Sequence, residues 1–163
     1  MLRIIKHLLI PDWWAQRPFR GRVLKRIEAA VAQSECQHRG ELRFAIEADL
    51  DPRALLKGIT PRQRAIEVFS QLRVWDTDEN SGVLIYVQLI DRDIEIVADR
   101  GINARVAQAE WEAICTRMEA EFRAGRFEAG ALAGIGEVTA LLARHFPVRD
   151  ANPNELPDRP VVL

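Results

Sequence analysis

The fold is decided by the stretch Gly82-Val83-Leu84-Ile85-Tyr86-Val87-Gln88-Leu89-Ile90-Asp91-Arg92-Asp93-Ile94-Glu95-Ile96-Val97-Ala98-Asp99-Arg100-Gly101. Its first arm is apolar almost throughout, which is typical of a strand covered on both faces. Its second arm alternates apolar residues with acidic ones, which is typical of a strand with one face in water. The stretch therefore predicts a β-hairpin that turns at Asp91-Arg92. The type of turn stays open, because no Asn-Gly or Asp-Gly pair is present.

The flanks of the hairpin predict four helices and one further strand. Apolar residues at helical spacing favour a helix over 20–38, and alternation over 41–48 favours a strand with one polar face. Thr60-Pro61 is typical of a helix start, and this helix is expected to stop near Val74. One helical turn is expected at 53–56, and two longer helices are expected at about 106–123 and 127–145.

The order of these elements is α-β-α-β-β-α-α. A helix separates the first two strands, so they are expected to be parallel through a right-handed crossover. The third strand is expected to be antiparallel to the second. We therefore predict an α/β fold, a small mixed β-sheet sandwiched between helices (α/β/α). The domain is placed at 20–146, after an N-terminal lead-in at 1–19 and before an extended C-terminal tail at 147–163.

Composition excludes some classes of protein. A chain of 163 residues that is 48% hydrophobic and 29% charged fits one soluble domain. Its net charge of −1 argues against a nucleic-acid binder, which needs a concentrated basic face. No apolar run is long enough to span a membrane, and the first ten residues lack the features of a secretion signal. With two isolated cysteines in addition, we expect a cytoplasmic protein.

Aromatic residues are concentrated in the lead-in. Trp13, Trp14 and Phe19 are expected to pack onto the body of the domain. Two adjacent tryptophans also suit a peripheral membrane contact, and this alternative stays open.

The topology predicts where polar residues meet. The second strand starts at Gly82, the third returns to Asp99, and the first starts at Glu41, so these positions share one end of the sheet. Carboxylate and amide oxygens from separate loops suit Ca²⁺ or Mg²⁺. The alternative is a solvated loop with an Asp99–Arg100 pair. This end also collects Glu35, His38 and Glu79; the candidate metal ligands are Asp76, Asp78, Asn80, Asp99 and Glu41, and Arg100 is the candidate anion contact.

Several catalytic motifs fail on inspection. Asp76, Asp78 and Asn80 have the spacing that opens an EF-hand loop, but Ser81 stands where that loop needs glycine. Neither cysteine is followed by arginine at the spacing of a cysteine phosphatase. The three histidines lack metal-ligand spacing, and there is no glycine-rich phosphate loop.

The hairpin, together with Phe122-Arg-Ala-Gly125-Arg-Phe127-Glu-Ala-Gly130, resembles the TPM domain of plant thylakoid-lumen photosystem II repair proteins and of many bacterial proteins. The resemblance covers roughly 22–146. It implies an α/β/α sandwich and a divalent-cation site, carried here by Asn80 and Asp99. Some plant members are described as phosphatases. This chain departs from the pattern in having Asp99-Arg100-Gly101 where many members have Gly-Tyr-Gly, and one extra residue after Asn80.

Three functions follow as hypotheses. The leading one is a non-catalytic accessory module that binds Ca²⁺ or Mg²⁺ and a protein partner. The second is a metal-dependent phosphohydrolase in which Arg100 holds phosphate. The third is a ligand-free structural domain that interacts through Trp13, Trp14 and the C-terminal tail.

Overall fold

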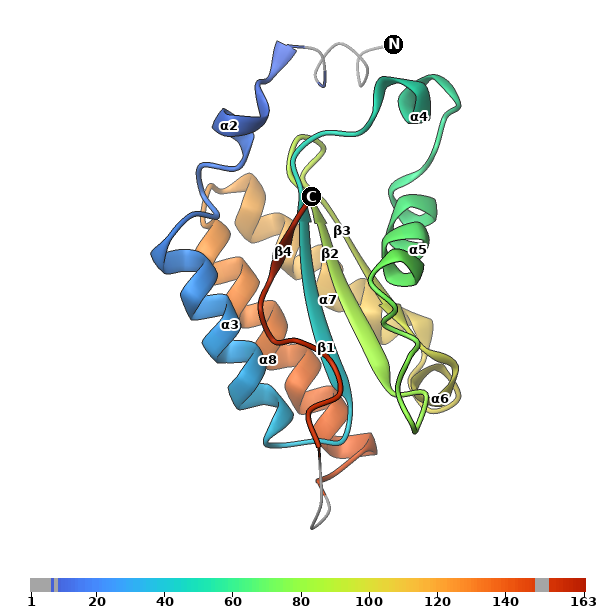
Figure 1. The fold of residues 1–163 in the computed structure, drawn as a ribbon. Coiled ribbons are helices and arrows are strands. Elements are labelled where there is room, and N and C mark those ends of the chain that lie inside the picture. Colours follow the sequence, from blue (N-terminus) through green and yellow to red (C-terminus); the bar gives the residue numbers. More distant parts are fainter. Residues whose placement is uncertain (1–6, 8, 149–152) are drawn as a thin grey trace.

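A computed structural model describes residues 7, 9–148 and 153–163. Figure 1 shows a sheet between two helical layers, which confirms the predicted α/β/α class. Helices α3, α7 and α8 cover one face, and α5 covers the other. The elements are α2 (Asp12–Ala15), α3 (Arg22–Glu35), β1 (Glu41–Glu47), α4 (Pro52–Leu56), α5 (Pro61–Gln71), β2 (Gly82–Gln88), β3 (Asp93–Ala98), α6 (Arg100–Asn103), α7 (Gln108–Arg123), α8 (Phe127–His145) and β4 (Val161–Val162).

The sheet has the order β3-β2-β1-β4. β1 and β2 are parallel, with Glu41 opposite Gly82, and β2 and β3 are antiparallel, with Val83 opposite Ala98. Both pairings confirm the prediction. The short strand β4 was not predicted; it adds to β1 in parallel, with Ala45 opposite Val161.

The hairpin turn spans four residues, from Leu89 to Arg92, between the two strands. The main-chain nitrogen of Arg92 donates to the Leu89 carbonyl oxygen over 3.3 Å, and Arg92 itself adopts φ 55°. A longer loop with one left-handed residue closes the hairpin, so the Asn-Gly pair of a two-residue turn is not needed.

The helices follow their sequence signals closely. α8 has the predicted bounds, and α7 begins two residues later than expected. Thr60 and Gln63 form a reciprocal capping box at the start of α5, which Pro61 reinforces. α5 ends three residues earlier than expected, where Arg73 takes φ 53°.

Two separate hydrophobic cores hold the layers together. On one face, side chains such as Phe44 and Ile85 pack with Trp111 and Phe122 against α3, α7 and α8. On the other face, a smaller core joins Leu84 and Tyr86 to α5 and to Leu156 of the C-terminal segment. The C-terminal segment is therefore part of the packed structure.

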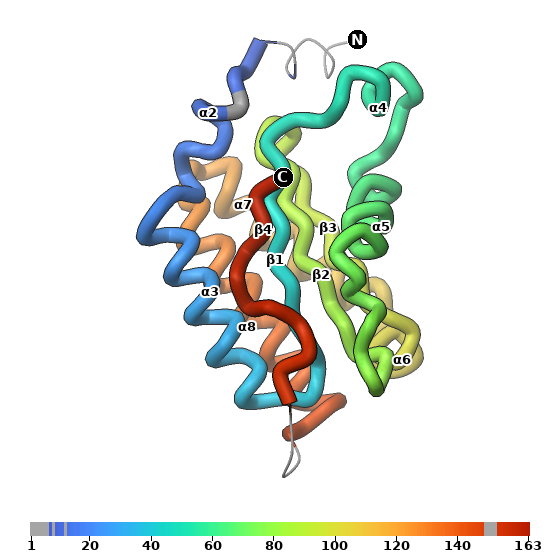
Figure 2. The backbone as a smooth tube through the Cα atoms, in the orientation of Figure 1, coloured from blue at the N-terminus to red at the C-terminus, as the bar shows by residue number. Residues whose placement is uncertain are grey.

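The polar face of β1 is buried. Glu41, Arg43 and Glu47 are all shielded from solvent, although the alternation suggests a solvent-facing surface. Figure 2 shows the reason, because the C-terminal segment runs alongside β1 for most of its length. At the other end of the strand, Arg64 from α5 covers Glu47.

The N-terminal aromatic residues divide into two groups. Phe19 is 2% exposed and packs against the rings of Phe122 and Phe127, as predicted. Trp13 and Trp14 are 64% and 56% exposed, so the prediction that they pack onto the body is wrong. They lie on α2, a helix of one turn that contributes little buried surface. Among the described helices, none combines the length and apolar character needed to cross a membrane.

Candidate functional site

The structure brings together the three segments that the sequence placed at one end of the sheet. The Gly82 carbonyl oxygen accepts a hydrogen bond from the Asp99 main-chain nitrogen over 2.8 Å. The Ser81 carbonyl oxygen accepts from the Glu41 nitrogen over 3.1 Å. The loop before β2, the end of β3 and the start of β1 therefore meet at this edge, which we call the acidic edge.

Asp99 at the acidic edge has a carboxylate oxygen without a hydrogen-bond partner among the described residues. Its Oδ1 accepts from the Arg100 main-chain nitrogen over 2.7 Å and caps α6. Its Oδ2 is buried and has no hydrogen-bond partner among the described residues. Arg100 does not form the ion pair with Asp99 that was the alternative; its Nε donates instead to Asn80 Oδ1 over 2.8 Å.

Gly101 leaves room for two main-chain oxygens next to Asp99. A Cβ atom at this position would lie 2.6 Å from the carbonyl oxygens of both Glu79 and Asn80. Carboxylate and carbonyl oxygens are the donors that Ca²⁺ prefers. Asp99, Asn80 and the Glu79 carbonyl therefore offer the oxygen types that a hard divalent cation prefers.

The other acidic residues of the loop have arginine partners or face solvent. Asp76 pairs with Arg73 over 3.4 Å, and Glu79 pairs with Arg39. Asp78 is exposed, and its main-chain nitrogen donates to Glu155 Oε2 over 2.9 Å. Within 7, 9–148 and 153–163, no group of three or more His, Cys, Asp or Glu side chains is arranged to hold a metal ion.

Glu41 holds the C-terminal segment. Its Oε2 accepts from the main-chain nitrogens of Glu155 and Leu156 over 3.2 and 3.0 Å. Burial raises the pKa of this carboxyl, and the two main-chain donors oppose that rise. Glu41 therefore anchors residues 155 and 156 instead of facing the loop, which departs from its predicted role as a metal ligand. The sequence carries no signal for this contact, since more than 100 positions separate the partners.

Glu35 and His38 are also structural. Glu35 is buried at the end of α3, where its Oε1 accepts from the Leu42 nitrogen over 2.9 Å. Burial raises the Glu35 pKa to about 9, and hydrogen bonding to Asp158 of the C-terminal segment adds to the rise. Burial lowers the His38 pKa to about 4, and its Nε2 lies 2.8 Å from Ser34 Oγ.

The Glu35 carboxyl predicts a dependence of stability on pH. The unfolded chain releases this proton near pH 4.5, whereas the folded chain keeps it to about pH 9. The contribution of Glu35 to the free energy of unfolding is therefore greatest below the unfolded pKa and falls as the pH rises toward the folded one. We expect Glu35→Gln, which imitates the protonated carboxyl, to flatten this fall by about 2–3 kcal/mol between about pH 6 and pH 8.

Urea denaturation across this pH range measures the effect. Glu128→Gln serves as the control, because Glu128 is partly exposed and pairs with Arg26 on the surface. Equal pH slopes for Glu35→Gln and the unaltered chain would contradict the assignment of a buried, protonated Glu35.

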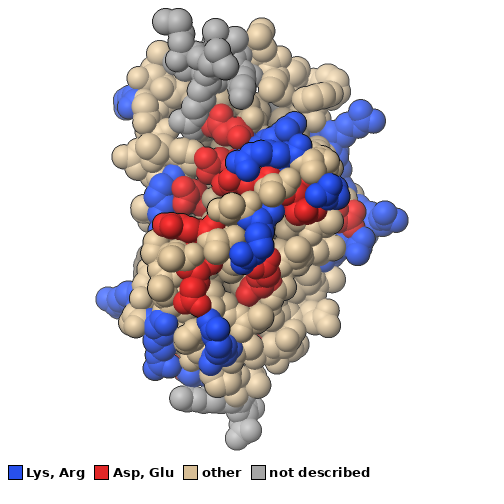
Figure 3. All heavy atoms as spheres, turned by 180° about the vertical axis from the view of Figure 1, so that it is seen from behind, with Lys and Arg blue, Asp and Glu red and all other residues tan. Residues whose placement is uncertain are grey.

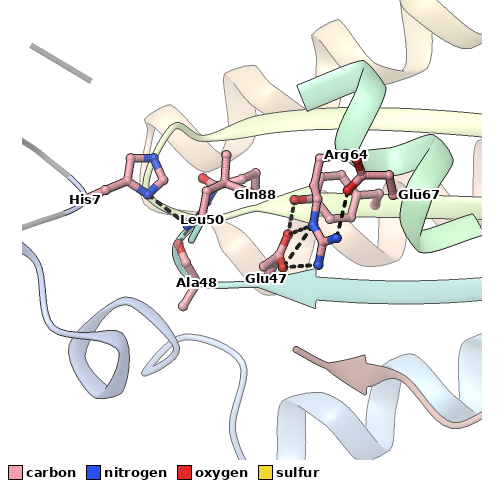
Figure 4. Close-up of polar contacts among 8 residues, drawn as sticks. His7, Glu47, Ala48, Leu50, Arg64, Glu67 and Gln88 are labelled. Atoms are coloured by element: carbon pink, nitrogen blue, oxygen red, sulfur yellow. Dashed lines mark hydrogen bonds and ion pairs between the residues drawn. The ribbon is translucent and has the colours of Figure 1, made fainter. Parts of the chain in front are cut away.

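A second polar network lies at the opposite end of the sheet (Figure 4). Glu47 accepts from Arg64 Nε over 2.9 Å and from Arg64 Nη2 over 2.6 Å, and the Tyr86 hydroxyl also donates to it. Farther along, His7 Nδ1 accepts from the Leu50 main-chain nitrogen over 3.1 Å. Burial and the Glu47 contact raise the Tyr86 pKa, so its hydroxyl stays protonated. The contacts of Glu47 with Arg64 and Tyr86 are therefore structural.

The described residues contain no obvious activated nucleophile. Burial raises the pKa of the Cys115 thiol to about 12, which keeps it protonated at neutral pH. Cys36 is exposed, and its thiol donates to the Ala32 carbonyl oxygen. On the face seen in Figure 3, acidic and basic side chains are interspersed and form no large region of one sign.

Comparison with known proteins identifies the family. A family model for the TPM domain matches residues 20–141. The BA42 protein from the psychrophilic bacterium Bizionia argentinensis has a similar solved structure, with a TM-score of 0.78 and 29% identity over 88% of this chain and 94% of that one. The N-terminal domain of a protein from P. gingivalis shares the fold alone, with a TM-score of 0.60 and 15% identity over 81% and 83% of the two chains. A search of curated proteins found no match. The chain belongs to the TPM domain family.

Proposed function

We propose that this protein is a non-catalytic TPM module that binds Ca²⁺ or Mg²⁺ at the acidic edge and acts through a protein partner. The observation that carries the proposal is the buried Asp99 Oδ2, which has no hydrogen-bond partner among the described residues. A carboxylate oxygen in that state is costly unless a cation or water satisfies it.

The proposed ligand set is narrower than the set predicted from sequence. Asp99 supplies the carboxylate, and Asn80 and the Glu79 carbonyl supply neutral oxygens, with water completing the coordination. Asp78 is exposed at the same loop and is available as a further carboxylate. Coordination by the Asn80 amide would replace its hydrogen bond from Arg100, so we expect modest affinity.

Cation binding is expected to raise the stability of the folded chain. A ligand at about 100 times its dissociation constant adds about 2.7 kcal/mol to the free energy of unfolding. We expect Ca²⁺ or Mg²⁺ to raise Tm in the unaltered chain and to have little effect on Asp99→Asn. Asparagine retains the cap of α6, so this variant removes the charge without removing the local structure.

Thermal unfolding against cation concentration checks the proposal, with Asp76→Asn as the matched control. Asp76 is an exposed carboxylate of the same loop whose partner is Arg73, and its variant is expected to retain the shift. Absence of a shift in the unaltered chain with either cation, or an equal shift in Asp99→Asn, would exclude the site.

One observation favours a metal-dependent phosphohydrolase as a second candidate. Arg100 is exposed beside Asp99 and uses only its Nε side-chain nitrogen in the hydrogen bond to Asn80. Its two terminal nitrogens have no hydrogen-bond partner among the described residues and could bind a phosphate, which guanidinium groups bind in bidentate fashion. Cation-dependent hydrolysis of p-nitrophenyl phosphate that is lost in both Asp99→Asn and Arg100→Gln would favour this candidate over the non-catalytic module.

A further inference from the structure

A second candidate binding site lies at the opposite end of the sheet from the acidic edge. Three segments distant in sequence, residues 10–18, 89–92 and 125–127, line a half-open cavity of about 520 Å³. They are the chain around α2, the turn of the β2–β3 hairpin and the junction of α7 with α8. This volume lies in the range of cavities that bind small molecules.

The lining of the cavity is mainly apolar. Leu89 and Ile90 are buried, Phe127 is half-buried, and Trp14 contributes an exposed ring. None of the described residues that line the cavity is acidic. An apolar group of a ligand would therefore find contacts on several sides without displacing a charged partner.

Two arginines provide the polar contacts. Arg17 and Arg92 both line the cavity and are exposed. Neither side chain forms a hydrogen bond or ion pair with any residue that the structure describes. Most other described arginines do donate to a carboxylate or carbonyl, such as Arg64, Arg117 and Arg126. Unused guanidinium groups beside an apolar cavity favour a ligand with an anionic head, most readily a carboxylate.

We propose that this cavity binds a small amphipathic carboxylate, with its apolar tail among Trp14, Leu89, Ile90 and Phe127 and its carboxylate on Arg17 and Arg92. Nothing in this proposal depends on a cation at the acidic edge. A concave site suits one small molecule that is partly covered by its walls, whereas a bilayer surface would require the apolar residues to protrude. The bilayer is therefore the competing outcome, since Leu9 and Trp13 are exposed nearby in the sequence.

Isothermal titration with straight-chain carboxylates, from butanoate to decanoate and below their micelle concentrations, tests the site. We expect saturable binding that tightens about fourfold for each added methylene and levels off when the cavity is full. We expect 1-octanol to bind at least about tenfold more weakly than octanoate, because it lacks the charge that the guanidinium groups recognise.

The variant Arg17→Gln/Arg92→Gln is expected to remove the preference for octanoate over 1-octanol while leaving 1-octanol binding unchanged. Both positions are exposed, and thermal unfolding confirms that the variant folds. The matched control is Arg22→Gln, an exposed arginine outside the cavity, which is expected to bind octanoate as the unaltered chain does. No saturable binding of any carboxylate, an unchanged preference in the double variant, or binding only to phosphatidylcholine vesicles would each overturn the proposal.

Discussion

Gly82→Ala is expected to destabilise the fold by about 3 kcal/mol or more, because a side chain at this position has no space. A Cβ atom on Gly82 would lie 1.8 Å from the carbonyl oxygen of Val74 and 2.9 Å from its carbonyl carbon. These are main-chain atoms, which cannot move aside as a side chain can. The Val74 nitrogen also donates a hydrogen bond to the Phe69 carbonyl oxygen over 3.0 Å, which holds Val74 in place. Relief of the clash would require β2 or the end of α5 to move.

The effect of Gly82→Ala is measured by chemical denaturation against Gly136→Ala. Gly136 is an exposed position within α8, where a Cβ atom would meet nothing within 4 Å. There the same substitution is expected to stabilise the chain by about 0.5–1 kcal/mol, because alanine loses less backbone entropy. If Gly82→Ala lowers the free energy of unfolding by less than about 1 kcal/mol, the prediction is contradicted, because the loop before β2 must then move at little cost.

Arg64→Met is expected to cost about 3 kcal/mol, because it leaves the Glu47 carboxylate buried with the Tyr86 hydroxyl as its one side-chain partner among the described residues. The side chains of Arg64 and Glu47 are 18% and 10% exposed, so water can replace little of the lost contact. Hydrogen bonding to Glu47 raises the Arg64 pKa, which agrees with a strongly held guanidinium. Methionine keeps most of the apolar stem of arginine, so the decrease in the free energy of unfolding measures mainly the removal of the guanidinium charge.

Two comparisons make this test specific. Arg117→Met removes an arginine of an exposed pair, with Glu137, and is expected to cost less than about 1 kcal/mol. The double variant Arg64→Met/Glu47→Gln is expected to be more stable than Arg64→Met alone, because the amide keeps an acceptor for Tyr86 without an unpaired charge. Chemical denaturation of the three variants measures these differences in the free energy of unfolding. Similar decreases for Arg64→Met and Arg117→Met would contradict the prediction.

The candidate site shows how far sequence reasoning reached. Asp99 and Asn80 were placed at one end of the sheet because strand direction follows from the order of elements, and the structure brings them together there. The role of Glu41 could not be predicted in the same way. Its partners are the main-chain nitrogens of residues 155 and 156. Every residue except proline has such a nitrogen, so the sequence does not indicate which ones Glu41 contacts.

The sequence by itself determined the hairpin, the helices and the parallel crossover. These depend on local periodicity and capping, which involve residues close together in the sequence. Examples are the alternation in β3 and the Thr60-Pro61 start of α5. The tertiary structure alone decided the course of the C-terminal segment. β4 has only two residues and no periodicity of its own; it is a strand because the edge of β1 offers hydrogen bonds to it.

The same distinction applies to charge. Alternation placed Glu41, Arg43 and Glu47 on one face of a strand, but it could not show whether water or protein covers that face. The C-terminal segment and α5 cover it, and their contacts turn the predicted polar surface into a buried one. Burial depends on which distant segments meet, and that is a property of the folded chain.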